Sequence, residues 1–285
     1  MIRIGARVHR SSGRARPSAA NTCPCARRCC RPAVVACAVV ALWLAAGAVQ
    51  AAPAIDYFRE GRWAQEVVPS LVVGEAVYLA TPARPKVLAI LAEPAGTSKG
   101  GVIVLHGLGV HPDWGLNGGL RTSLADAGFT TLSVQMPVLA ADAPRADYRV
   151  TLPEAGDRIA AAIAYLRSRG VTKVAVVAHS MGATMADAYL ARPDALPVDA
   201  WAPVGMLVAF AAPPKEPVLD VVAESDLREV KDTAPLRESR LPKDGCSRAV
   251  TIAGTDHYFG NNPKELAAVI AAFLDRVFTG RCGSL

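Results

Sequence analysis

The residue best suited to do chemistry is Ser180. Residues 174–183 read Val-Ala-Val-Val-Ala-His-Ser-Met-Gly-Ala, so an apolar run leads directly into a serine between small residues, and a helical pattern follows. A serine at such a strand–turn–helix junction lies at a helix N-terminus, where backbone amides can stabilise a developing negative charge. Ser180 is therefore a candidate nucleophile, and the Met181 amide is a candidate oxyanion donor. Ala178 replaces the first glycine of the Gly-x-Ser-x-Gly pattern, and the alternative is a serine that only caps a helix.

A second glycine-rich loop follows another apolar run. Residues 101–109 read Gly-Val-Ile-Val-Leu-His-Gly-Leu-Gly, and the glycines on both sides of Leu108 permit a strained turn with an inward-facing backbone N–H. The Leu108 amide would then be a second oxyanion donor. An ordinary glycine loop is the alternative. The sequence has neither a Gly-x-Gly-x-x-Gly nor a Walker pattern, so it does not predict phosphate binding here.

A serine nucleophile needs a general base and an acid that orients the base. His257 is the best-placed base, because it follows the last strand-like run and precedes the last helical pattern. Asp226 is the best-placed acid, because it follows another strand-like run and sites in open α/β sheets form at the carboxyl ends of strands. Asp220 and Glu224 remain alternative acids, and Asp256 is interpreted as shaping the turn before His257.

The elements that would position these residues alternate along the chain after residue 52. Short continuous apolar runs are typical of a parallel sheet that is covered on both faces. The expected strands are residues 74–80, 86–93, 102–105, 130–135, 174–177, 204–210, 218–223 and 249–252. The clearest helix begins at Pro263, with Asn262 as its cap. This alternation predicts a mostly parallel α/β sheet in one domain, residues 52–285.

Residues 1–51 have the pattern of a secretory signal peptide. They contain eight arginines and no acidic residue, then an apolar stretch, then the small residues Val49 and Ala51 before an expected cleavage site. The alternative is an uncleaved membrane anchor, because the apolar stretch is long enough to span a bilayer. We expect a periplasmic or secreted protein that contacts a membrane only if this segment remains uncleaved.

The composition excludes several classes of protein. Of 285 residues, 52% are hydrophobic and 20% are charged, which is unlike a disordered chain. The formal charge of +6 belongs to the leader, because the remainder has 23 basic residues against 25 acidic ones. A basic footprint for nucleic acid is therefore missing from the expected domain, and nucleic acid is not an expected partner.

From about residue 70 to residue 279, the chain resembles the α/β-hydrolase superfamily. Its candidate residues Ser180, Asp226 and His257 occur in the order found in that superfamily. The chain also resembles, more closely, a proteobacterial family of unknown function within the superfamily. The segments that carry this resemblance are His-Gly-Leu-Gly-Val-His-Pro-Asp-Trp-Gly at residues 106–115, Leu120-Arg121, and Thr-Leu-Ser-Val-Gln-Met-Pro at residues 131–137. The resemblance implies the α/β-hydrolase fold, with helices on both faces of the sheet, and short inserts predict no large lid domain.

The resemblance also implies roles for residues. Ser180 would be the nucleophile, Asp226 the acid and His257 the base, with oxyanion amides at Leu108 and Met181.

In this fold the last strand and the last helix run in opposite directions, so the two cysteines that flank them would lie at one edge. We therefore expect a disulfide between Cys246 and Cys282 in an oxidising compartment, with two free thiols as the alternative.

These features predict an exported, carboxylesterase-like serine hydrolase that forms a covalent acyl-enzyme. Its partner would be a small-molecule acyl substrate, and the chemistry requires neither a metal nor an organic cofactor. His111 and Trp114 are expected to line the substrate cleft. The alternatives are a peptidase or thioesterase, or a catalytically silent binding or envelope-associated protein with the same fold, which the replacement at Ala178 favours.

Overall fold

A computed structural model describes residues 52–283, and these residues form one compact unit. The predicted signal peptide, residues 1–51, lies outside the described residues. Within residues 52–283, none of the helices has both the length and the apolar composition needed to cross a membrane.

The unit is built on an eight-stranded sheet in the order β1-β2-β4-β3-β5-β6-β7-β8. In chain order the strands are β1 (Glu75–Leu79), β2 (Val87–Ala92), β3 (Gly101–Leu105), β4 (Thr130–Val134), β5 (Val174–His179), β6 (Ala200–Val204), β7 (Leu219–Ser225) and β8 (Arg248–Asp256). The pairs β1–β2 and β2–β4 are antiparallel, and all others are parallel. Strands β2 to β6 are buried along their whole length, which is why they read as continuous apolar runs.

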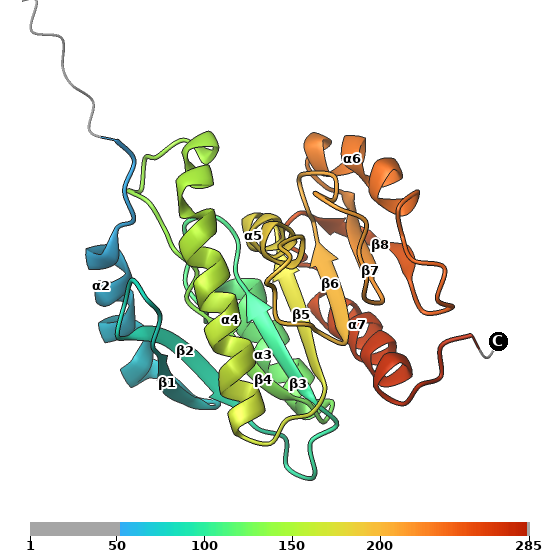
Figure 1. The fold of residues 1–285 in the computed structure, drawn as a ribbon, viewed down its shortest axis with the longest axis horizontal. Coiled ribbons are helices and arrows are strands. Elements are labelled where there is room, and N and C mark those ends of the chain that lie inside the picture. Colours follow the sequence, from blue (N-terminus) through green and yellow to red (C-terminus); the bar gives the residue numbers. More distant parts are fainter. Residues whose placement is uncertain (1–51, 284–285) are drawn as a thin grey trace, which may run out of the picture. The chain divides into compact units, whose positions relative to one another are not determined.

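Helices cover both faces of the sheet (Figure 1). They are α2 (Tyr57–Val67), α3 (Gly115–Asp126), α4 (Leu152–Ser168), α5 (Met181–Leu190), α6 (Arg228–Glu238) and α7 (Pro263–Phe278), with 3-10 turns η1 (Val68–Ser70) and η2 (Arg145–Thr151). One apolar core layer packs α4 and α5 against the sheet, and a second packs α3 and α7. The predicted α/β architecture is confirmed, and η2 and short loops occupy the places where a lid domain could be inserted.

One local prediction was wrong, and another was confirmed in position alone. The strand expected at residues 204–210 is β6, which ends at Val204, because Gly205 turns the chain at φ 59°. Met206 and Phe210 beyond it are buried without being in a strand, so apolarity alone misplaced the strand. Asn262 is the N-cap residue of α7, as predicted, but its side chain makes no capping hydrogen bond; the side-chain amide donates instead to the Ala253 carbonyl, at 2.6 Å.

Helix α2, which the sequence pattern did not predict, is attached through a buried cation. The guanidinium of Arg158 is fully buried, and it binds Glu60 of α2 at 3.1 Å and Glu154 of α4. It also donates to the Gln135 carbonyl at 2.9 Å. A buried charge is tolerated only when it is paired and hydrogen-bonded, so this network fixes α2 against the body of the unit.

Cys246 and Cys282 are joined by a disulfide, with their Cα atoms 4.8 Å apart. Cys246 precedes β8 and Cys282 follows α7, so the bond ties the start of the last strand to the end of the last helix.

Candidate active site

Ser180 lies on a strained turn between β5 and α5. Its backbone has φ 55° and ψ −117°, and it is one of two non-glycine residues with positive φ in residues 52–283. Such strain concentrates at functional sites. The Ser180 amide donates to the Val204 carbonyl at 2.8 Å, which holds the turn against β6. Gly182 is required here, because a Cβ atom would lie 2.4 Å from the His106 carbonyl oxygen.

The structure brings Ser180, His257 and Asp226 into one hydrogen-bonded row. The Oγ atom of Ser180 lies 2.9 Å from Nε2 of His257, and Nδ1 of His257 lies 2.6 Å from Oδ1 of Asp226. A carboxylate only accepts hydrogen bonds, so Nδ1 carries the proton and Nε2 is free to accept from the serine hydroxyl. All three side chains are buried. This is the arrangement that activates a serine for attack on a carbonyl carbon.

Asp226 is held as a carboxylate by its neighbours. Burial by itself would raise its pKa, but hydrogen bonds from His257 and from the amides of Ala223 and Leu227 bring the pKa below its ordinary value. The two amides lie 3.0 Å and 2.8 Å from the carboxylate oxygens. Gly205 leaves room for this pair, because a Cβ atom there would lie 3.0 Å from the His257 ring.

His179, next to Ser180, holds the backbone of His257. Its Nε2 donates to the backbone carbonyl of His257 at 2.8 Å, and the two rings are 4.8 Å apart. Burial lowers the pKa of His179 to about 4, with a smaller contribution from the nearby His257. His179 is therefore neutral at neutral pH and positions the segment that carries His257.

The candidate oxyanion amides belong to Leu108 and Met181. Met181 begins α5, so its amide is one of the first N–H groups, which have no acceptor within the helix. Leu108 lies in the turn after β3, and both residues line the same cavity as Ser180. Nδ1 of the buried His106 lies 2.9 Å from the Gly107 carbonyl oxygen. In a trans peptide the C=O and N–H groups point in opposite directions, so this bond also sets the direction of the Leu108 N–H.

A cavity of about 880 Å³ opens around Ser180 and His257. Trp114, predicted to line the cleft, does so and is 56% exposed. His111 is not among the residues that line this cavity. Its ring lies 5.7 Å from the rings of both Trp63 and Trp114, and the substrate-binding role expected for His111 stays a prediction.

Arg59 of α2 supports the loop that carries Leu108, and sequence reasoning missed it. Its guanidinium donates to the carbonyls of Gly109 at 2.9 Å and Leu139 at 3.0 Å, and it stacks 4.5 Å above the Trp63 ring. No local pattern around Arg59 signals these contacts, because their partners are distant in the sequence. For the positioning role of His106, the sequence signal was the His-Gly pair that directly follows β3.

The alternative acids have other partners. Asp220 is fully buried against Arg237, at 2.9 Å, and Glu224 accepts from the Gly254 amide. Asp256 accepts from the Tyr258 amide and so shapes the turn before His257. Among the described residues, no group of three or more histidine, cysteine, aspartate or glutamate side chains could hold a metal ion.

Comparisons with known proteins bear on the fold. Residues 70–157 match a family model described as a protein of unknown function, DUF3530. A search of the curated proteins gave no match.

Solved structures with the same fold include a dienelactone hydrolase from Anabaena variabilis (20% identity, TM-score 0.57), with 71% of this chain and 97% of that chain covered. A serine hydrolase without a lid from Xanthomonas campestris has 17% identity and a TM-score of 0.57, covering 72% and 95%. A serine hydrolase homologue from Coxiella burnetii has 14% identity and a TM-score of 0.56, covering 71% and 98%. The resemblance inferred from the sequence is confirmed at the level of the fold: the chain has the α/β-hydrolase fold, without a lid domain.

Proposed function

We propose that this protein is a serine hydrolase that cleaves carboxylic esters through a covalent acyl-enzyme. The observation that carries the proposal is the row of hydrogen bonds from Ser180 through His257 to Asp226, at 2.9 Å and 2.6 Å. The strained turn at Ser180 and the cavity around it support the proposal. The solved structures with the same fold include proteins named as serine hydrolases and a dienelactone hydrolase.

In the first half of the reaction, Ser180 Oγ attacks the ester carbonyl carbon while Nε2 of His257 takes the hydroxyl proton. The carbonyl oxygen becomes an oxyanion and accepts hydrogen bonds from the amides of Leu108 and Met181. Asp226 holds the Nδ1–H tautomer and stabilises the imidazolium. His257 then donates its proton to the departing alcohol oxygen, the C–O bond breaks, and the acyl group remains on Ser180.

In the second half, water attacks the acyl-enzyme. His257 removes a proton from the water as the new C–O bond forms, and the same two amides stabilise the second oxyanion. The bond to Ser180 Oγ then breaks, the proton returns to the serine, and the carboxylic acid leaves. The partner in this reaction is a small acyl substrate.

The His106 side chain would have a positioning role. Its Nε2 accepts from the Met136 amide at 2.9 Å, so Nδ1 carries the proton and donates to the Gly107 carbonyl. Burial lowers the pKa of His106 to about 3, so this arrangement persists at neutral pH. His106 thereby keeps the Leu108 amide directed to the oxyanion.

We further propose that residues 1–51 direct export and are removed, so that the mature protein acts in the periplasm or outside the cell. The disulfide between Cys246 and Cys282 supports this location, because such bonds persist mainly in oxidising compartments.

One experiment tests both proposals. The full chain is expressed, purified and treated with a fluorophosphonate, and its intact mass is compared with that of Ser180→Ala. We expect a mass that starts near Ala52, a single adduct on the wild type and none on the variant. A folded wild-type protein without an adduct would refute the hydrolase mechanism. An intact leader would refute cleavage alone.

A further inference from the structure

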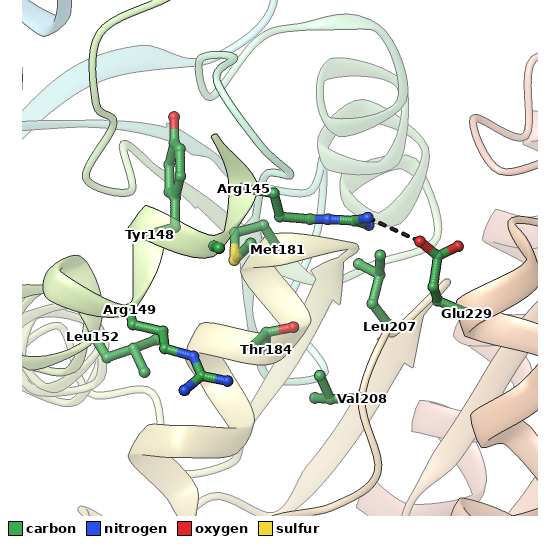
Figure 2. A pocket seen from close by; sticks show the side chains of 10 residues that line it. Arg145, Tyr148, Arg149, Leu152, Met181, Thr184, Leu207, Val208 and Glu229 are labelled. Atoms are coloured by element: carbon green, nitrogen blue, oxygen red, sulfur yellow. Dashed lines mark hydrogen bonds and ion pairs between the residues drawn. The ribbon is translucent and has the colours of Figure 1, made fainter. Parts of the chain in front are cut away.

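A second cavity shares the lining residues Met181 and Arg145 with the cavity around Ser180, and Figure 2 shows the side chains that line it. It has a volume of about 280 Å³, and its walls are mostly apolar. Leu152 at the start of α4, Thr184 of α5, and Leu207 and Val208 after β6 form part of these walls. Three charged residues also line the cavity: Arg145, Arg149 and Glu229. Met181 also lines the catalytic cavity, so the two spaces share a boundary at the residue that follows the nucleophile.

The position of His257 distinguishes the two ends of a bound ester. His257 must protonate the leaving alcohol, so the alcohol has to lie within hydrogen-bond reach of Nε2. His257 lines the larger cavity and is not among the residues that line the smaller one. The acyl chain extends from the carbonyl carbon away from the alcohol. With the carbonyl oxygen at the Met181 amide, the chain is directed past Met181 into the smaller cavity.

We propose that this smaller cavity, the acyl subsite, binds the unbranched aliphatic acyl chain of the substrate. The inference rests on the proposed function. An apolar protein cavity of about 150 Å³ accommodates the six carbons of benzene. A cavity of about 280 Å³ therefore has room for on the order of ten carbons. The substrate class is esters of medium-chain fatty acids.

An ion pair marks the boundary between the two cavities. Arg145 of η2 reaches to Glu229 of α6, with 2.9 Å between Nη2 and Oε1 (Figure 2). Arg145 lines both cavities. Both side chains are about half exposed, at 46% and 52%. An exposed ion pair contributes little stability, so the two side chains can separate at little cost when a chain enters.

The test measures kcat/KM for p-nitrophenyl esters from acetate to dodecanoate. We expect kcat/KM to rise about fourfold for each added methylene, the effect of burying about one CH₂ group, and to level off near eight to ten carbons. Val208→Phe places a ring in the acyl subsite and should lower the octanoate-to-acetate ratio at least tenfold. Leu207→Phe is a second filling variant. Val150→Phe is the matched control, because Val150 is similarly exposed but does not line the cavity.

The outcomes separate the two proposals. If the wild type takes no fluorophosphonate and hydrolyses no ester, the proposed function fails and the acyl subsite fails with it. If the wild type is labelled and hydrolyses acetate, but the chain-length profile is flat or neither filling variant changes the ratio, the acyl subsite alone is wrong. A series of alkyl acetates completes the design: if Val208→Phe changes preference for the alcohol chain instead, the two ends of the ester are assigned the wrong way round.

Discussion

The buried imidazole of His106 allows acid sensitivity to be worked out from the structure. Its Nε2 accepts from the Met136 amide, and Nδ1 donates to the Gly107 carbonyl, so the ring fits only as the neutral form. Burial lowers its pKa from the ordinary 6.5 to about 3. Between those two pH values the unfolded chain binds a proton at His106 and the folded chain does not. The free energy of unfolding must therefore fall as the pH falls below 6.5, and this loss continues until the pH approaches 3.

The size of the effect at a given pH follows from how far that pH lies below the pKa of His106 in the unfolded chain. pH 5 lies about 1.5 units below the pKa of the imidazole in the unfolded chain, and each unit corresponds to about 1.36 kcal/mol. The free energy of unfolding is therefore about 2 kcal/mol lower at pH 5 than at pH 8 through this group. His179, whose pKa is about 4, adds about 2 kcal/mol by the same reasoning. Asp187 has the opposite sign: burial raises its pKa to about 6, so protonation of its folded form returns about 1.4 kcal/mol at pH 5.

Because several groups contribute, the measurement is a difference between variants. The free energy of unfolding in urea is measured at pH 8 and pH 5 for the wild type and for His106→Asn. Asparagine retains a donor where Nδ1 lies but does not titrate. It also loses the acceptor for the Met136 amide, so we expect about 1–3 kcal/mol less stability at pH 8. The loss between pH 8 and pH 5 should be about 2 kcal/mol smaller than in the wild type.

His111→Asn is the control for this experiment. His111 is half-buried and burial also lowers its pKa, but it is less enclosed than His106, so the pH dependence should change less. Equal pH dependence in the wild type and His106→Asn would refute the conclusion that the folded protein holds His106 neutral.

Three further predictions follow from contacts around the site. Asp226→Asn should lower kcat by about 10⁴, because the base would lose its oriented tautomer, and ester turnover with circular dichroism as a folding control checks this. His106→Gln keeps an acceptor for the Met136 amide but loses the donor to Gly107, so kcat should fall at least about tenfold, and by no more than the ~10²–10³ cost of losing an oxyanion donor. His106→Asn should lose less; equal losses would contradict the positioning role. Cys246→Ser with Cys282→Ser should lower the free energy of unfolding by about 4 kcal/mol, because the bond closes a loop with a sequence separation of 36, and urea unfolding with and without reductant measures it.

The sequence predicted the parts of the site that depend on strand ends. Ser180, Asp226 and His257 each follow a strand of the parallel sheet, and parallel strands deliver their carboxyl ends to one edge. Their proximity therefore followed from a correct assignment of three strands. The disulfide between Cys246 and Cys282 followed from the opposite directions of the last strand and the last helix.

The parts that could not be predicted are those whose partners are far away in the sequence. Helix α3 contains Gly115, Gly118 and Gly119, and α6 contains Pro235, so neither has strong local helix propensity. Packing against the sheet stabilises α3, and the buried pair of Arg237 with Asp220 attaches α6. Pro203 likewise concealed β6, because a proline argues against a central strand.

The loop of the candidate oxyanion amide is held from two sides by polar contacts. Arg59 of α2 binds the Gly109 carbonyl, and His106 binds the Gly107 carbonyl, so the peptide unit before Leu108 and the one after Gly109 are both held. His106 contacts Gln135, whose carbonyl accepts from the buried Arg158, and Arg158 binds α2 through Glu60. Helix α2 therefore contacts the loop directly and also through the buried network. Because these contacts join α2 to the loop, we expect variants that detach α2 also to disturb the position of the Leu108 amide.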